Sequence, residues 1–222
     1  MGKLLYITAN PKAEADSYGL KTGSQLIRAY RENHPKDPIT HLDLYREEIP
    51  FLDADVMAAW GKLAAGASFD SLTGEERSKV SRIAELTDQF ISADRYVFVS
   101  PMWNFSLPPV LKAYIDTVCI AGKTFQYTEA GPVGLLQGKR AVHIHATGGV
   151  YSQAPADAMD FSGRYLTTLL NFLGISDVET IHVEGMNQYP DKVEDILKQA
   201  MARAWKVGAA LGENLLRFKS EA

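Results

Sequence analysis

Residues 95–109 read Arg-Tyr-Val-Phe-Val-Ser-Pro-Met-Trp-Asn-Phe-Ser-Leu-Pro-Pro, and this stretch decides the fold. Residues 95–99 are mostly β-branched and aromatic, which is typical of a buried central strand. From Val110 onward, apolar residues recur at helical spacing, and the two prolines suit the first turn of that helix because an N–H there needs no helical partner. The segment between them is predicted to be a loop at the carboxyl end of a strand, where open α/β sheets bind ligands.

The composition of this loop is unusual for a connector, because Trp103 and Phe105 flank the polar Asn104. Two aromatic side chains beside an amide suit a flat heteroaromatic ring, with apolar surface for the ring system and polar groups for its edge. Composition alone supports equally well an interpretation in which both aromatics merely cover the end of the sheet.

The rest of the chain alternates between strand and helix patterns. Helices are expected after Ser17 and from the capping box that begins at Thr73 to about residue 93. A third should run from the two prolines to near residue 118. Two more are expected over residues 158–173 and 191–216. Residues 45–74 are less regular, with an amphipathic piece around 54–65, and are predicted to be an excursion at one edge. Further strands are expected at residues 3–9, 39–44, 140–146 and 177–183. This alternation predicts a doubly wound α/β fold, a five-stranded parallel sheet with helices on both faces, in a single domain over residues 1–222.

Two stretches carry a family resemblance. Residues 101–105, Pro-Met-Trp-Asn-Phe, followed by Pro108, resemble the isoalloxazine-binding loop of the FMN-dependent NADH:azoreductases, which belong to the flavodoxin-like NAD(P)H:quinone reductases. Residues 123–136, Lys-Thr-Phe-Gln-Tyr-Thr-Glu-Ala-Gly-Pro-Val-Gly-Leu-Leu, resemble a second hallmark of these enzymes. The resemblance runs along nearly the whole chain. It implies a flavodoxin-like strand order, which five strands fit better than the six-stranded dinucleotide-binding order, and a flavin ring held by Met102, Trp103, Asn104 and Phe105.

The loop after the first strand is the predicted phosphate site. It leads into a helix at Ser17, Tyr18 and Gly19, and a helix start offers free N–H groups and a partial positive charge. An ordinary N-cap serine is the plainer interpretation of Ser17. The resemblance places a serine-rich turn here, and this chain departs from it because Asn10 stands where a serine often lies. Neither the P-loop pattern nor the dinucleotide fingerprint is present, so NADH is expected as a transient co-substrate beside bound FMN.

The loop after the fourth strand is the third part of the predicted site. It reads Thr147-Gly148-Gly149-Val150-Tyr151, and its glycines would let a ligand ring approach the backbone closely, although a simple turn explains them as well. The resembling family carries a similar Gly-Gly pair, commonly preceded by an arginine. Thr147 occupies that position here, so a charge that would help the reduced flavin is missing.

The hallmark at residues 123–136 is expected to form a short hairpin with exposed aromatics. By resemblance, the protein is a homodimer in which part of this segment lies near the flavin of the partner subunit. Phe125 and Tyr127, together with Tyr151, are therefore predicted to bind the acceptor substrate.

Other features are weaker or exclude whole classes of function. His143 and His145 lie at spacing two on one strand, which could bind a metal ion, but no third ligand is obvious and packed strand histidines are the alternative. Cys119 is the only cysteine, which excludes an intramolecular disulfide. It is expected to be a small buried residue. The net charge of −4 gives no reason to expect nucleic acid. With neither a signal-peptide pattern nor an apolar run long enough for a membrane span, the protein is expected to be soluble and cytoplasmic.

The sequence is thus interpreted as an FMN-dependent NADH:quinone and azo-compound oxidoreductase. By resemblance, NADH reduces FMN and leaves, and a quinone or azo compound then takes two electrons in the same pocket. No side chain is assigned as a catalytic acid or base, since the flavin carries out the chemistry. Two alternatives stay open: a flavodoxin-type electron carrier that does not turn over NADH, and an FMN-free binding module that keeps the fold.

Overall fold

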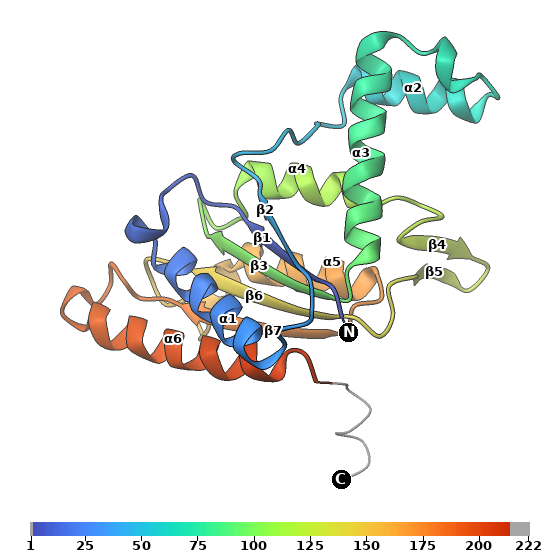
Figure 1. The fold of residues 1–222 in the computed structure, drawn as a ribbon. Coiled ribbons are helices and arrows are strands. Elements are labelled where there is room, and N and C mark those ends of the chain that lie inside the picture. The colour runs from blue at the N-terminus through green and yellow to red at the C-terminus, as the bar shows by residue number, and fades with distance from the viewer. Residues whose placement is uncertain (1, 214–222) are drawn as a thin grey trace.

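The computed structural model describes residues 2–213 and contains a central parallel sheet (Figure 1). Its strands lie in the order β2-β1-β3-β6-β7, and every neighbouring pair is parallel. This is the predicted flavodoxin-like order, in which the chain reverses direction across the sheet beside the first strand. The strands are β1 (Leu4–Thr8), β2 (Ile39–Asp43), β3 (Arg95–Pro101), β6 (Arg140–Ala146) and β7 (Asp177–Val183).

Helices cover both faces of the sheet, as predicted. On one face, α1 (Tyr18–Asn33) packs beside α6 (Val193–Ala210). On the other lie α3 (Gly74–Ser92), α4 (Pro109–Val118) and α5 (Phe161–Phe172). The edge excursion contains α2 (Ala54–Ala64), and α2 together with the start of α3 projects from the body of the molecule (Figure 1).

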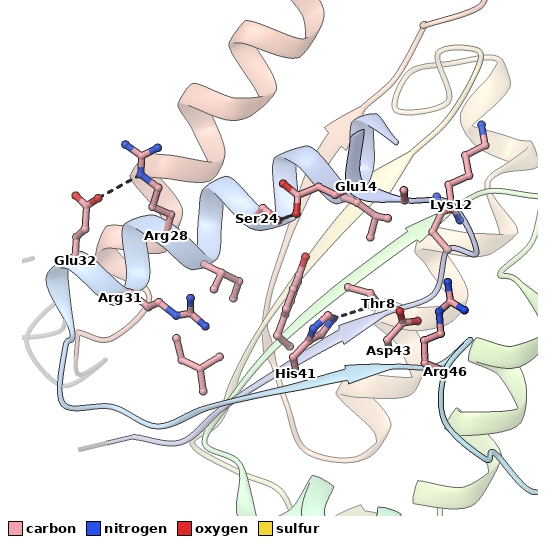
Figure 2. A pocket seen from close by; sticks show the side chains of 16 residues that line it. Thr8, Lys12, Glu14, Ser24, Arg28, Arg31, Glu32, His41, Asp43 and Arg46 are labelled. Atoms are coloured by element: carbon pink, nitrogen blue, oxygen red, sulfur yellow. Dashed lines mark hydrogen bonds and ion pairs between the residues drawn. The ribbon is translucent and has the colours of Figure 1, made fainter. Parts of the chain in front are cut away.

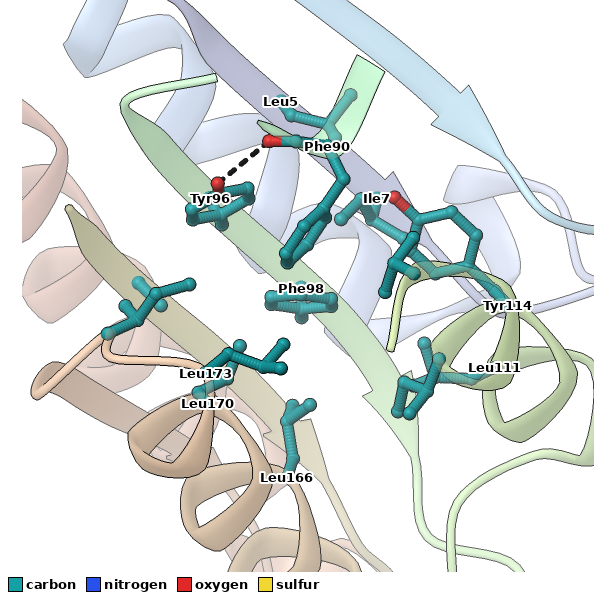
Figure 3. Close-up of a cluster of buried hydrophobic side chains, with 14 of the residues drawn as sticks. Leu5, Ile7, Phe90, Tyr96, Phe98, Leu111, Tyr114, Leu166, Leu170 and Leu173 are labelled. Atoms are coloured by element: carbon teal, nitrogen blue, oxygen red, sulfur yellow. Dashed lines mark hydrogen bonds between the residues drawn. The ribbon is translucent and has the colours of Figure 1, made fainter. Parts of the chain in front are cut away.

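The three central strands β1, β3 and β6 are buried because each face of the sheet has its own apolar cluster. Figure 3 shows the cluster under α3, α4 and α5, where Phe90 stacks on Tyr96 with ring centroids 4.4 Å apart. The Tyr96 hydroxyl donates to the Phe90 carbonyl at 2.8 Å, so the one polar atom of that buried ring has a partner. A second cluster joins the opposite face to α1 and α6. The two clusters hold the carboxyl ends of the strands in fixed positions.

Two helices have boundaries that differ from the prediction. The helix expected from residue 158 begins at Phe161, because residues Ala156–Met159 form the 3-10 turn η3 and Asp160 caps the helix by accepting from the Gly163 N–H at 2.8 Å. The final helix begins at Val193 after the short turn η4 (Pro190–Lys192). This helix ends at Ala210, earlier than expected, and the expected end at residue 216 lies outside the described residues. Short 3-10 turns also occur at η1 (Glu14–Asp16) and η2 (Phe69–Ser71).

The predicted hairpin is present as the antiparallel pair β4 (Phe125–Thr128) and β5 (Gly131–Gly134). The expectation that its aromatics are exposed is right for Tyr127, which is 75% exposed, and wrong for Phe125, which is 8% exposed. Phe125 is buried because the hairpin packs on the end of α5, where its ring lies 4.8 Å from that of Phe172. Among residues 2–213, none of the helices has both the length and the apolar character that crossing a membrane requires.

Candidate active site at the carboxyl ends of the strands

Two adjoining cavities open where β1, β3 and β6 end. Their volumes are about 270 and 520 Å³, and Met102, Gly148 and Asn187 line both. The loops that follow three separate strands meet here, as the parallel sheet requires. Between them, the two cavities are lined by all the residues predicted to bind the cofactor: Asn10, Ser17, Tyr18, Gly19, Met102, Trp103, Asn104, Phe105, Thr147, Gly148 and Gly149.

Ser17 is the N-cap of α1, and its side chain is almost fully buried. Its Oγ accepts one hydrogen bond from the Leu20 N–H at 3.2 Å and another from Asn10 Nδ2 at 3.0 Å. Both acceptor positions of the hydroxyl are therefore used, and its own proton is free to be donated. The first-turn N–H groups of Tyr18 and Gly19 have no acceptor among residues 2–213. This helix start can bind an anion with backbone and hydroxyl donors together.

The backbone at Gly19 passes close to the end of β6. A Cβ atom added there would lie 3.1 Å from the Cβ of Ala146, so a larger side chain would crowd the wall of the smaller cavity. Two charged side chains of opposite sign, Lys12 and Asp16, also line that cavity. Any anion bound here would therefore contact mainly the helix start and not a cluster of cations.

The aromatic loop forms a tight two-residue turn. Trp103 and Ser106 exchange backbone hydrogen bonds at 2.9 and 3.0 Å, and Asn104 and Phe105 between them have φ values of +49° and +66°. A turn with two positive φ values is of type I′, which asparagine tolerates and phenylalanine does not favour. Trp103 is 40% and Phe105 39% exposed at the cavities, which favours the ligand-binding interpretation over the one in which they cover the sheet.

The glycine loop packs on the segment that follows β7, whose residues were not among those predicted for the site. The Gly148 carbonyl accepts from the N–H groups of Asn187 at 2.8 Å and Gln188 at 3.1 Å. A Cβ atom at Gly148 would lie 2.6 Å from Asn187 Nδ2, so only glycine fits there without displacing the amide. Asn187 and Gln188 both line the larger cavity. The sequence could have pointed to these two residues, because they follow a predicted strand that ends at the same edge of the sheet.

The predicted acceptor-binding residues are divided between the two ends of the sheet. Tyr151 lines the larger cavity, and its ring meets that of Phe105 edge-on at 6.2 Å. Phe125 and Tyr127 belong to the hairpin, which lies beside the amino ends of the strands (Figure 1). Within one chain, therefore, these two aromatics do not line the cavities.

The two strand histidines are stacked inside the fold. Their ring centroids are 4.9 Å apart, and His143 Nε2 lies 3.0 Å from the Ser100 hydroxyl. Burial lowers the pKa of both His143 and His145, so both are neutral near pH 7. Within residues 2–213, His, Cys, Asp and Glu side chains do not gather in groups of three that could hold a metal ion. The thiol of Cys119 packs against the core, and burial raises its pKa to about 12.

A further cleft of about 610 Å³ lies between α1 and the edge strand β2 (Figure 2). It meets the active-site cavities at Asn10 and Lys12, and its floor contains His41, whose ring stacks on Tyr6 at 4.7 Å. Four basic and three acidic side chains line it, so its charge is nearly balanced. Because the loops after β3 and β6 do not reach it, the cavities at the strand ends are the candidate active site in preference to this larger cleft.

Comparison with known proteins agrees with this geometry. Residues 2–207 match a family model described as a flavodoxin-like fold. An FMN-dependent NADH:quinone oxidoreductase 2 of Bacillus subtilis is 53% identical over 208 residues, which cover 94% of this chain and 99% of the relative. A Bacillus pumilus protein of the same class is 55% identical over the same shares of the two chains. The chain belongs to the family of FMN-dependent NADH:quinone oxidoreductases.

Solved structures extend the family to azoreductases. An azoreductase from Bacillus anthracis is 38% identical with a TM-score of 0.87, covering 94% of this chain and 99% of that one. An FMN-dependent NADH-azoreductase of the same species, solved in complex with FMN, is 34% identical with a TM-score of 0.89, covering 96% and 100%. Membership in this oxidoreductase family agrees with the resemblance that the aromatic loop and the hairpin carry.

Proposed function

We propose that this chain binds FMN at the carboxyl ends of the strands and transfers two electrons from NADH to quinones and azo compounds. The observation that carries the proposal is the free donor set at the start of α1, close to an exposed aromatic turn. The Ser17 hydroxyl and the N–H groups of Tyr18 and Gly19 would hold the phosphate. The turn at Asn104 and the glycine loop at Gly148 would hold the ring system from two sides.

When bound, FMN would supply the redox chemistry for moving two electrons from NADH to the acceptor. The chain's own residues bind, orient and shield the ring. Trp103 and Phe105 offer flat apolar surface, and Gly148 and Gly149 let the ring approach the backbone. We assign no side chain as a catalytic acid or base. Thr147 places no positive charge beside the ring.

One preparation tests the cofactor and the activity separately. Flavin released by heat from the purified protein and identified by chromatography should be FMN, and finding mainly FAD or none would refute the cofactor assignment. NADH should then bleach the bound flavin, and menadione should sustain steady NADH oxidation. Bound FMN without NADH oxidation would indicate an electron carrier of the flavodoxin type. A colourless protein that keeps the fold would indicate a binding module.

We further propose a homodimer. Large apolar side chains are exposed in the described surface, including Phe51 at 68%, Met57 at 51%, Tyr127 at 75% and Phe161 at 60%. Exposed apolar surface of this kind often marks an interface. A two-fold axis would bring the hairpin of one chain to the flavin cavity of its partner. Light scattering during gel filtration tests the assembly, since a mass of one chain would contradict it.

We propose a cytoplasmic location, because the reaction consumes NADH. Fractionation of the producing cells tests the location, since recovery outside the cytoplasm would contradict it.

We also propose that residues 1–222 function as one FMN-binding domain. A single cooperative unfolding transition of the FMN-loaded protein would support one domain. Two separate transitions, only one of which shifts with FMN, would contradict it.

A further inference from the structure

We propose that Glu184 and Asp160 are positioning residues that together set the separation of Tyr151 and Phe105 at the mouth of the larger cavity. They would thereby determine which flat acceptors enter. The selection of acceptors rests on the proposed function, whereas the anchoring of the two rings concerns only residues of this chain. Tyr151 and Phe105 both line that cavity and meet edge-on at 6.2 Å, although they come from loops that follow different strands.

Glu184 holds the Tyr151 side. It follows β7 directly, so the sheet fixes its backbone. Its Oε2 accepts from the N–H of Tyr151 at 2.8 Å and from the N–H of Ser152 at 3.0 Å, and its Oε1 accepts from the Ser152 hydroxyl. One carboxylate thus takes three donors from the two residues that leave the glycine loop. Hydrogen bonds to a charged acceptor are roughly twice as strong as neutral ones, so Tyr151 is tied to the end of the last strand.

Asp160 holds the Phe105 side through the first turn of α5. Its Oδ1 accepts from the Gly163 N–H at 2.8 Å and so fixes the direction in which the helix begins. The next residue, Phe161, donates its N–H to the Phe105 carbonyl at 3.1 Å. Phe105 has a φ of +66°, a conformation that a phenylalanine keeps only when its surroundings hold it. The helix start supplies that support from a rigid element.

Asp160 also lies beside a buried imidazole. His145 Nδ1 lies 3.8 Å from Asp160 Oδ2, and the side chain of His145 is 1% exposed. Burial lowers the pKa of His145, while both Asp160 and Glu184 raise it and His182 lowers it. The ring of His182 meets that of His145 at 6.1 Å. Because the two rings that the anchors hold meet edge-on at 6.2 Å, we expect the effects of removing the anchors to be coupled and not additive.

The matched substitutions are Glu184→Gln and Asp160→Ala, with Asp160→Asn and Glu179→Gln as controls. Glutamine keeps the size of Glu184 but presents an NH₂ group where a second acceptor is needed. Asparagine at position 160 still caps a helix, whereas alanine does not. Glu179 lies on the same strand and pairs with Arg203 at 2.6 Å, away from the cavity. Glu184→Asp, which keeps the charge but not the reach, serves if Glu184→Gln fails to fold.

The first readout is amide hydrogen exchange and needs no turnover. Glu184→Gln should speed exchange at Tyr151 and Ser152 at least tenfold, and Asp160→Ala should do the same at Phe161. Asp160→Asn and Glu179→Gln should leave these rates within twofold of wild type. Unchanged exchange at Tyr151 and Ser152 in Glu184→Gln would overturn the proposal, whatever the enzyme's activity.

The second readout separates the acceptor from the cofactor. In the FMN-loaded protein, Glu184→Gln and Asp160→Ala should raise the KM for menadione about tenfold, the change that 1.4 kcal/mol of binding free energy produces. The KM for the smaller benzoquinone, the kcat and the FMN dissociation constant should stay within threefold. Equal losses for both quinones, or a loss of FMN affinity that accounts for the KM change, would overturn the specificity role. A wild-type protein without NADH oxidation would instead refute the proposed function and leave the exchange result to stand alone.

Discussion

Asn10 donates a hydrogen bond from its Nδ2 to the Oγ of Ser17 at 3.0 Å, across the loop between β1 and α1. The Leu20 N–H occupies the other acceptor position of the same hydroxyl. Asn10 therefore makes a direct contact with the predicted phosphate-binding serine. It turns the Ser17 hydroxyl into a donor directed away from the chain's own groups, which is what a phosphate oxygen needs.

Ser17→Ala should therefore weaken FMN binding about 5- to 30-fold, because it removes one charge-assisted hydrogen bond together with a helix cap, a loss of ~1–2 kcal/mol. Fluorescence titration of the flavin-free protein measures the dissociation constant. Ser24→Ala is the matched control, since the Ser24 hydroxyl lies further along the same helix and donates to Glu14 at 2.6 Å. An equal loss of affinity in both variants would assign the effect to the stability of the helix and not to phosphate binding.

Phe105→Gly should separate stability from function. Glycine accepts the φ of +66° without strain, whereas a phenylalanine at this position stores on the order of 1–3 kcal/mol. The ring is 39% exposed, so its removal costs little packing. We expect the melting temperature of the flavin-free variant to be equal to or above that of wild type, while kcat/KM for quinones falls. A clear drop in melting temperature would show that the ring stabilises the fold and that its conformation is not strained for function.

The fold was predictable from the sequence because most strands of the sheet are short apolar runs that alternate with helices, and several of these helices begin at a side-chain cap. The capping box at Thr73 and Glu76 illustrates this, since both of its hydrogen bonds form. The positions of the three site loops followed from the same rule. The burial of Phe125 was not predictable, because the pattern of a short hairpin does not say which element it packs against. The roles of Asn187 and Glu184 also require tertiary contacts between loops far apart in the sequence.

The buried histidines predict how stability depends on pH. Burial holds the pKa of His143 and His145 below the value of about 6.5 that histidine has in an unfolded chain. Below pH 6.5 the unfolded chain therefore binds protons that the folded chain does not, and the free energy of unfolding decreases as the pH falls. Each such histidine contributes a slope of up to about 1.4 kcal/mol per pH unit.

Urea unfolding at pH 7.5, 6.5 and 5.5 measures this slope. His143→Gln should lower stability at pH 7.5, because the ring packs in the core and lies beside Ser100, but it should also flatten the decline between pH 6.5 and 5.5. A decline as steep as that of wild type would mean that His143 is protonated in the folded protein or that other groups set the slope.

The burial of Phe125 decides which hairpin residue can test whether two chains share each active site. Phe125→Ala would damage the packing on α5, whereas Tyr127 is 75% exposed and can be truncated without disturbing the fold. If Tyr127 forms a wall of the partner's cavity, Tyr127→Ala should raise the KM for quinones several-fold in the homodimer. Ser17→Asp, which sets a negative charge against the phosphate, should abolish FMN binding in its own chain.

Mixing the two variants, with exchange of subunits verified by mass spectrometry, separates a shared pocket from a self-contained one. In the heterodimer, the chain carrying Ser17→Asp has no flavin but supplies an intact Tyr127 to the flavin-loaded chain. One pocket then carries both defects and the other carries neither, so the KM of the remaining activity should return to the wild-type value. The control is a chain that carries both substitutions, mixed with wild-type chains. In that heterodimer the flavin-loaded pocket faces the truncated Tyr127, so its KM should stay raised. If the heterodimer keeps the raised KM of Tyr127→Ala, Tyr127 acts within its own chain and each pocket is complete without the partner's hairpin.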